Sequence, residues 1–219
     1  GGHTSLYLVP APGEYRLVAR TRDDAAGEAY DKVAKLLGLG YPGGPVIDRL
    51  AKQGNDRAIP FPSTRLTHAD RNAPSATGAG LLPPDVARRV DFSFSGLKTA
   101  VLRYVTDAKA RDGHLPESLV ADIAASFQRV VIEALLDRTF EAARWLDAKC
   151  IGIAGGVSAN SRLRAEAEVR GARYGLPVFV PPLSLSTDNA AMIGAAGFRR
   201  LAQGRGGDWD FNAEASLPL

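Results

Sequence analysis

The sequence has a single cysteine, Cys150, among its 219 residues. One cysteine cannot form a disulfide within the chain, so the fold does not depend on a disulfide framework and a reducing cytosol is the default compartment. Cys150 precedes a short apolar run, and we therefore expect its side chain to lie in the core. The class of small secreted proteins held together by disulfides is excluded.

Long apolar segments and an amino-terminal signal pattern are also lacking. No run approaches the roughly 20 apolar residues that a transmembrane helix needs, so we expect a soluble, cytoplasmic protein without a membrane partner. The chain opens on Gly1 and Gly2 instead of methionine and runs almost at once into a β-prone segment. We therefore expect that an amino-terminal part of the fold is missing.

A strong excess of charge of one sign is missing as well. Lys and Arg number 27 against 24 for Asp and Glu, and the formal charge of +3 permits a nucleic-acid partner without indicating one. A hydrophobic fraction of 45% is ordinary for a globular protein. The length suffices for one large domain or two small lobes.

Hydrophobic periodicity predicts an α/β protein. The β-prone runs 5–9 and 15–20 flank a segment with Pro and Gly, which predicts a hairpin. The last helix has many small residues, which predicts close packing on the sheet. Strands joined by helices in this order predict one mixed sheet with its ligand side at the strand ends. Further strands are expected at 91–94, 151–154 and 177–180, and helices at 23–37, 45–53, 95–112, 116–146, 158–170 and from 186 onward.

Two segments interrupt this α/β pattern. Residues 55–89 are rich in Pro, Ser, Thr, Gly and Asn with little periodicity, so we predict a long surface loop. Residues 94–147 read as helix almost throughout, which predicts a helical insertion.

Glycine pairs mark three turns, at Gly1-Gly2, Gly43-Gly44 and Gly155-Gly156. The third pair lies between an apolar strand and a helix for which Ser158 is the expected N-cap, and such a turn directs backbone N–H groups and the helix dipole at an anion. For a lone turn, an ordinary strand-to-helix connection is the favoured explanation. Together the turns fit an adenine nucleotide better, because polar residues accompany them: Asp31, Asp48, Asn160 and Asp188.

The simpler explanations for these polar residues stay open. Asp24, Glu28 and Asp31 repeat along one helix face, and Lys35 could neutralise them as part of a solvated surface. Asp188 could be a plain helix N-cap, and Asn160 could bond only to nearby backbone.

Six segments carry a family resemblance in the order in which they occur, namely 1–4, 23–32, 41–45, 92–98, 154–160 and 187–189. They resemble the signature blocks of the TsaD family, the tRNA N6-adenosine threonylcarbamoyltransferases once called O-sialoglycoprotein endopeptidases. The resemblance spans nearly the whole chain. It implies an actin-like ATPase fold (ASKHA, RNase H-like), with residues 1–219 as the C-terminal lobe and the N-terminal lobe missing.

The resemblance also implies an activity and a site. The family transfers the threonylcarbamoyl group of threonylcarbamoyl-AMP to N6 of the adenosine 3′ to the anticodon in tRNAs that read ANN codons. Its partners are tRNA and, in bacteria, the proteins TsaB and TsaE. No catalytic side chain is assigned. Asp188 would ligate one divalent metal, Fe²⁺ or Zn²⁺, and the adenylate would contact Gly1, Gly2, Asp31, Gly44, Asp48 and Asn160.

The sequence departs from the family in its histidines. The family's H-x-x-x-H metal motif is lacking, since the histidines are His3, His68 and His114. One carboxylate does not hold a transition metal tightly, so we expect the other ligands outside this chain and no activity from the chain alone. The lobe's first strand is missing too, which implies an exposed edge or a gap in the sheet and poor solubility.

Three other functions remain possible. A small-molecule kinase of the same fold would use the glycine turns for ATP. A metallo-glycopeptidase would follow the family's old name, although no H-E-x-x-H motif is present. A binding module without catalysis is the third.

Overall fold

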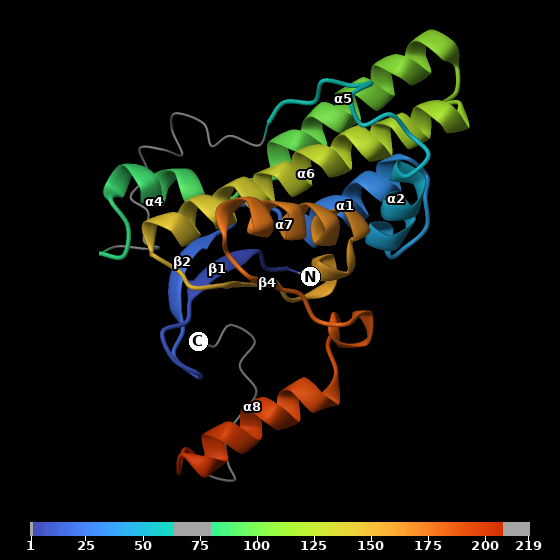
Figure 1. The fold of residues 1–219 in the computed structure, drawn as a ribbon. Helices are drawn as coiled ribbons and strands as arrows, with labels where there is room; N and C mark the ends of the chain where they lie inside the picture. Colours follow the sequence, from blue (N-terminus) through green and yellow to red (C-terminus); the bar gives the residue numbers. More distant parts are fainter. Residues whose placement is uncertain (1, 64–79, 208–219) are drawn as a thin grey trace.

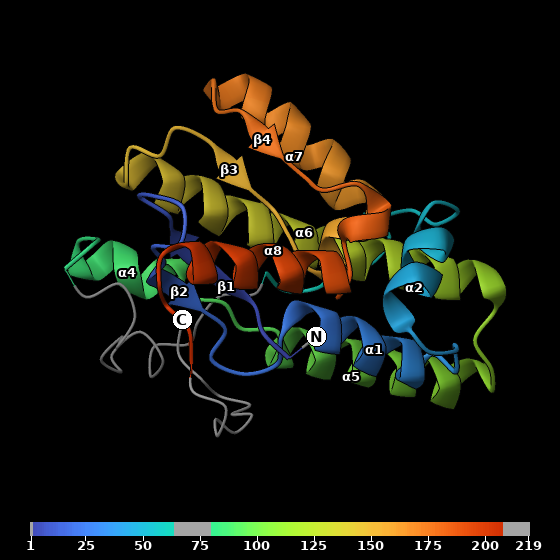
Figure 2. The ribbon, with the colours of Figure 1, turned by 90° about the horizontal axis from the view of Figure 1, so that it is seen from below.

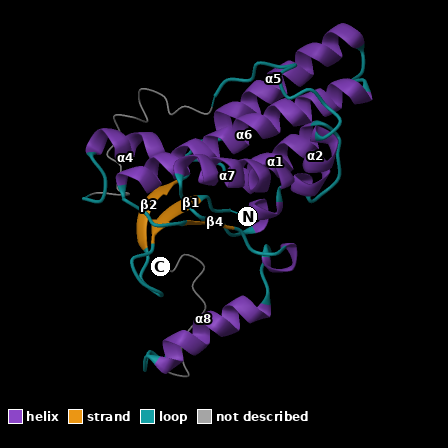
Figure 3. Ribbon diagram, viewed as in Figure 1, coloured by secondary structure: helices purple, strands orange, loops and turns teal. Residues whose placement is uncertain are grey.

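Helices make up most of the residues that the computed structural model describes, 2–63 and 80–207, with a few short strands beside them (Figure 3). The elements in chain order are β1 (Ser5–Leu8), β2 (Arg16–Arg20), α1 (Ala26–Leu36), α2 (Gly43–Ala51), α4 (Pro84–Val90), α5 (Ser95–Asp112), α6 (Glu117–Trp145), β3 (Ile151–Gly152), the 3-10 turn η1 (Gly156–Ala159), α7 (Ser161–Tyr174), β4 (Val178–Phe179), η2 (Leu183–Leu185) and α8 (Ala190–Ala202).

The hairpin predicted at the start of the chain is confirmed. Strands β1 and β2 pair antiparallel, with Ser5 opposite Arg20 and Leu8 opposite Arg16. The predicted strand at 91–94 is wrong, because this segment makes one isolated parallel bridge between Phe92 and Thr21.

The main core lies where α1 and α2 pack against α6. In α1, buried Ala26, Ala29, Tyr30 and Val33 fall at the spacing of one helix face. The Tyr30 ring meets Phe127 of α6 edge-on, with the centroids 5.2 Å apart. Helices α5 and α6 occupy most of 94–147, as the sequence predicted, and α5 ends at Gly113, whose φ of 75° suits glycine.

The predicted loop at 55–89 is shorter than expected in the part that the structure describes. Helix α4 occupies its end, and buried Val86 and Val90 pack with Val18 of β2. Ile59 and Phe61 at its start are buried in the main core. Apolar residues are too sparse in this segment for the sequence to show the hydrophobic periodicity that would predict their burial. The remaining residues, 64–79, lie outside the described residues.

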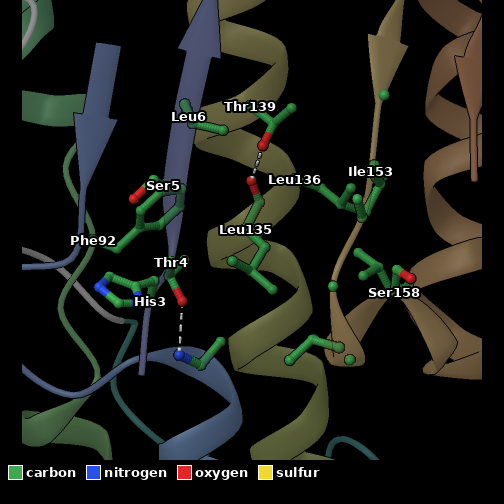
Figure 4. Close-up of a pocket in the computed structure, with 17 residues that line it drawn as sticks. His3, Thr4, Ser5, Leu6, Phe92, Leu135, Leu136, Thr139, Ile153 and Ser158 are labelled. Atoms are coloured by element: carbon green, nitrogen blue, oxygen red, sulfur yellow. Dashed lines mark hydrogen bonds between the residues drawn. The ribbon is translucent and has the colours of Figure 1, made fainter. Parts of the chain in front are cut away.

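One mixed sheet was predicted, and the described residues instead form two separate pairs of strands. Strand β1 pairs with β2, and β3 pairs parallel with β4. Figure 1 shows β1, β2 and β4 below α6, and Figure 2, seen from below, shows the β1–β2 pair well apart from the β3–β4 pair. Between them is a cavity of about 210 Å³ bounded by β1, β3 and the α6 residues Leu135, Leu136 and Thr139 (Figure 4).

Helix α8 was predicted to pack on the sheet, and this prediction is wrong. Figure 1 shows α8 well separated from the strands, and its large apolar side chains are exposed, with Ile193 at 68% and Phe198 at 74%. Cys150 is also exposed instead of buried. No helix within 2–63 and 80–207 combines the length and apolar character needed to cross a bilayer.

Candidate functional site

Asp31 of α1 lies against the start of α2. Its Oδ1 accepts a hydrogen bond from the backbone N–H of Gly43 at 2.8 Å, which satisfies one of the donors left free at a helix N-terminus. Lys35 is not its partner, and the ion pairs on this side of α1 are made by Lys32, at 2.7 Å from both Asp24 and Glu28. Within the described residues, Asp31 Oδ2 has no protein donor and is open to a ligand.

The two glycines of the second turn differ in their surroundings. A Cβ on Gly43 would lie 2.7 Å from the carbonyl oxygen of Tyr30 and 2.7 Å from Ala34 Cβ, so only glycine lets α2 approach α1 this closely. A Cβ on Gly44 would meet no atom within 4 Å. Gly43 therefore serves packing, while Gly44 has the open space that a ligand wall requires.

Asp48 of α2 reaches the start of α7. Its carboxylate accepts hydrogen bonds from Ser161 Oγ at 2.9 Å and from the Ser161 backbone N–H at 3.3 Å. Lys52 lies 4.0 Å away on the same helix. Asp31 and Asp48 thus each hold the first backbone N–H of a helix, α2 in one case and α7 in the other.

Asn160 is the N-cap of α7, in place of the predicted Ser158. Its Oδ1 accepts from the backbone N–H of Leu163 at 2.9 Å, but Asn160 does not bond only to nearby backbone, because its Nδ2 donates to Gln128 Oε1 at 2.7 Å. The sequence 156–159 forms the 3-10 turn η1, which displaces the start of α7 by two residues. Ser158 is 1% exposed, and its Oγ has no hydrogen-bond partner within the described residues.

A buried polar cluster joins Asp48 to Asn160. Gln128 of α6 donates from Nε2 to Asp48 Oδ1 at 3.1 Å and accepts at Oε1 from Asn160 Nδ2 at 2.7 Å. The Tyr30 hydroxyl donates to the same Oε1 at 3.4 Å. Burial raises the pKa of Tyr30, and the nearby Asp48 carboxylate raises it further, so this phenol stays a donor at neutral pH.

The third glycine turn lines the cavity between the strand pairs with Gly155 and Gly156. His3 and Thr4, which follow the first glycine pair in sequence, also line it (Figure 4). Thr4 Oγ1 accepts from the backbone N–H of Ala26 at 2.9 Å, which ties this turn to α1. Gly155 has a φ of 88°, a backbone conformation that favours glycine. Gly2 is exposed, and Gly1 lies outside the described residues.

Asp23 holds a further contact that the sequence did not reveal. Its carboxylate accepts from Ser93 Oγ at 2.5 Å, Ser95 Oγ at 2.7 Å and the Phe94 N–H at 2.7 Å, which fixes the start of α5 beside α1. Partial burial raises the pKa of Asp23, but these hydrogen bonds together outweigh it, and the pKa lies below its ordinary value. Asp23 was expected only to open a helix, which begins instead at Ala26.

The predicted metal ligand, Asp188, has no bonded contact with these residues in the part of the chain that the structure describes. Asp188 is exposed, and none of the hydrogen bonds or ion pairs of the described residues joins it to Asp31, Gly44, Asp48 or Asn160. It does not cap α8 either, because Asn189 accepts from the Met192 N–H at 3.0 Å. No group of three His, Cys, Asp or Glu side chains gathers around a metal position within 2–63 and 80–207. These residues alone do not fit Fe²⁺ or Zn²⁺, which need three or four protein ligands.

The structure links the predicted site residues in two places. Asp31 bonds the Gly43 N–H, beside Gly44 at the start of α2, and Asp48 of α2 is joined through Gln128 of α6 to Asn160, the N-cap of α7. Sequence reasoning missed Gln128, although a glutamine among the apolar residues of α6 is a recognisable signal.

Comparison with known proteins identifies the family to which this chain is similar. A family model described as "TsaD: tRNA N6-adenosine threonylcarbamoyltransferase" matches residues 1–195. Proteins named tRNA N6-adenosine threonylcarbamoyltransferase are similar to the whole chain. That of Anaeromyxobacter dehalogenans is 49% identical over 220 residues, that of Koribacter versatilis 46% over 242 and that of Microcystis aeruginosa 48% over 219.

These relatives are longer than the chain. The alignments cover all of the chain but only 59%, 62% and 58% of the three relatives in the same order. The chain therefore spans about three fifths of the length of the curated relatives it matches.

Proposed function

Because the chain belongs to the tRNA N6-adenosine threonylcarbamoyltransferase family, we propose that it forms part of an enzyme that makes this modification. The proposed reaction transfers the threonylcarbamoyl group from threonylcarbamoyl-AMP to N6 of the adenosine 3′ to the anticodon, in tRNAs that read ANN codons. The proposal includes the actin-like lobe, the helper proteins TsaB and TsaE, and a cytoplasmic location, where tRNA is used.

The assembly of Asp31, Gly44, Asp48 and Asn160 is the observation that supports an adenylate site. Asp31 Oδ2 is available to accept from a ribose hydroxyl, and the open face of Gly44 leaves room for the flat base. The N-termini of α2 and α7 provide positive dipole ends for the phosphate. We assign Gly1 and Gly2 to the same ligand on the family resemblance.

The transfer itself is an acyl substitution. The N6 nitrogen attacks the carbamoyl carbon, a C–N bond forms, the bond from that carbon to the phosphate oxygen breaks, and AMP leaves with its electron pair. The proton lost from N6 passes to solvent. The groups of this chain bind and orient the adenylate, and they hold its phosphate in place as the leaving group. The proposal keeps one divalent metal, Fe²⁺ or Zn²⁺, with Asp188 as one ligand, and no step here depends on it.

A chimera tests this proposal. The chain replaces the matching part of the Anaeromyxobacter relative, and the chimera is incubated with tRNA, threonine, bicarbonate, ATP and the partner proteins. We expect threonylcarbamoyladenosine in the digested tRNA by mass spectrometry, with at least a tenfold loss in Asp31→Ala. Asp85→Ala, which removes an acid exposed on α4, is the matched control.

Two results would overturn the proposal. One is a folded chimera that forms no modified nucleoside. The other is phosphate transfer to a sugar in the same mixture without modification of tRNA, which would identify a small-molecule kinase instead.

A further inference from the structure

Gln128 is the one side chain among the described residues that hydrogen-bonds to the side chains of both Asp48 and Asn160. It lies on α6 and is 3% exposed. Its two amide atoms contact different residues, since Nε2 donates to Asp48 at 3.1 Å and Oε1 accepts from Asn160 at 2.7 Å. The Asp48 and Asn160 side chains are therefore held relative to each other through one rigid amide group.

The direction of each amide follows from the charge on Asp48. An ionised carboxylate only accepts, so the Gln128 amide must present its NH₂ to Asp48 and its oxygen to Asn160. Asn160 must then present its own NH₂ to Gln128, which leaves its Oδ1 for the Leu163 N–H at 2.9 Å. Rotating the Gln128 amide by half a turn would bring two oxygens together at Asp48 and two NH₂ groups together at Asn160.

Burial makes this arrangement hard to replace with water. Tyr30 is 2% exposed and Asn160 8%, and the Tyr30 hydroxyl completes the cluster by donating to Gln128 Oε1 at 3.4 Å. A buried cluster in which every amide atom is bonded holds its members in one geometry.

We propose that Gln128 is a positioning residue for adenylate binding, acting through Asp48 and Asn160 without touching the substrate. The inference rests on the proposed function, because it takes the adenylate as the ligand of this site. Gln128 fixes which oxygen of Asp48 faces the ligand and aligns the α7 N-terminus, which Asn160 and Asp48 both cap. The site binds its nucleotide tightly only when α2 and α7 are joined in this way.

Two variants separate the contacts of Gln128. Gln128→Glu keeps the length of the side chain and an oxygen facing Asn160, but it places a second carboxylate against Asp48. Gln128→Met keeps the approximate volume and removes both contacts. The matched control is Gln203→Glu, at the exposed C-terminal end of α8.

The experiment measures the affinity of each variant for AMP by titration calorimetry, with folding checked by circular dichroism. Both Gln128 variants are expected to bind AMP about tenfold more weakly, the factor for loss of one hydrogen bond to a charged group. Gln203→Glu is expected to bind like the wild type. In the chimera, KM for threonylcarbamoyl-AMP is expected to rise about tenfold with kcat within about twofold, because Gln128 touches no reacting atom.

A double-mutant cycle distinguishes positioning from a general loss of packing. Gln128→Glu in an Asp48→Ala background is expected to weaken AMP binding no further than Asp48→Ala alone, because the carboxylate that it would oppose is gone. Effects that multiply instead would show that Gln128 acts independently of Asp48, and would overturn the inference.

The outcomes separate the two proposals. A wild-type chain and chimera that bind no AMP would overturn the proposed function and this inference with it. A wild type that binds AMP while folded Gln128→Glu binds it equally well would overturn the inference alone. Should Gln128→Met fail to fold, Gln128→Glu and the cycle decide the matter.

Discussion

Replacing Gly43 by alanine tests whether α1 and α2 meet as closely as the structure requires. The added Cβ would lie 2.7 Å from Ala34 Cβ, 2.7 Å from the Tyr30 carbonyl oxygen and 2.8 Å from Asp31 Cα. Two of these atoms are backbone of a buried helix and cannot rotate away. Helix α2 must therefore move outward, which also lengthens the 2.8 Å hydrogen bond from Gly43 to Asp31.

The cost follows from these two effects. Overpacking in a well-packed interior costs about 1–3 kcal/mol, and weakening a hydrogen bond to a carboxylate adds about 1 kcal/mol. The free energy of unfolding should fall by about 2–4 kcal/mol. For a protein of this size, each kcal/mol corresponds to about 2–4 °C, so Tm should fall by about 10 °C.

Gly44→Ala is the matched control for this substitution. Its Cβ would meet no atom within 4 Å, so Tm should stay within about 3 °C of the wild type. AMP affinity should nevertheless fall, since the methyl group occupies the open space assigned to the ligand. Thermal unfolding followed by circular dichroism measures both variants. A Tm for Gly43→Ala equal to that of Gly44→Ala would refute the close approach of α1 and α2.

Three further predictions concern other parts of the chain. Asp23→Ala should lower stability at pH 7 and flatten its pH dependence. The lowered pKa gives a stabilisation that is present above the ordinary value of 3.8 and is lost as pH falls through the folded pKa, so urea midpoints for wild type and variant should converge as the pH falls below that folded pKa. Asp188→Ala should leave both Tm and the amount of zinc retained by this chain unchanged, because Asp188 is exposed and has no companion ligands among the described residues. Elemental analysis measures the zinc, and a loss of bound zinc in the variant would contradict this prediction. Combined Ile193→Ser and Phe198→Ser should reduce self-association in sedimentation velocity with Tm unchanged, because both side chains are more than two-thirds exposed, and unchanged association would exclude α8 as the contact surface.

Local sequence patterns predicted those features of the fold that depend only on neighbouring residues. The apolar spacing of Ala26, Tyr30 and Val33 gave the buried face of α1, and Gly113 marked the end of α5. These signals come from helix geometry and backbone sterics, which act within a few residues. The glycine turns and the family's blocks both led us to expect a shared ligand for the polar residues Asp31, Asp48, Asn160 and Asp188, although spacing alone relates no two of them. The structure joins two of these, Asp48 and Asn160, through Gln128.

The roles of individual site residues could not be predicted in the same way. Asp31 and Asp48 each hold the first N–H of a helix that begins 12 or more residues away, and Gln128 contacts Asp48 across 80 residues of sequence. Such contacts depend on how α2 and α7 meet α6. A periodicity argument assigns Gln128 only to the buried face and supplies no partner for it.

The position of α8 shows the same limit most clearly. Ile193, Gly197 and Leu201 form an apolar stripe at helical spacing, which indicates a surface that the helix needs to bury. Burial also needs an opposing apolar face, and Tyr7 of β1 and Phe179 of β4 are themselves exposed on strands that belong to separate pairs. With the cavity between β1 and β3, the two pairs present no continuous sheet face to a helix. An apolar stripe in the sequence therefore shows that one face of a helix can be buried. That face of α8 is exposed here because the two strand pairs offer no continuous surface for it to cover.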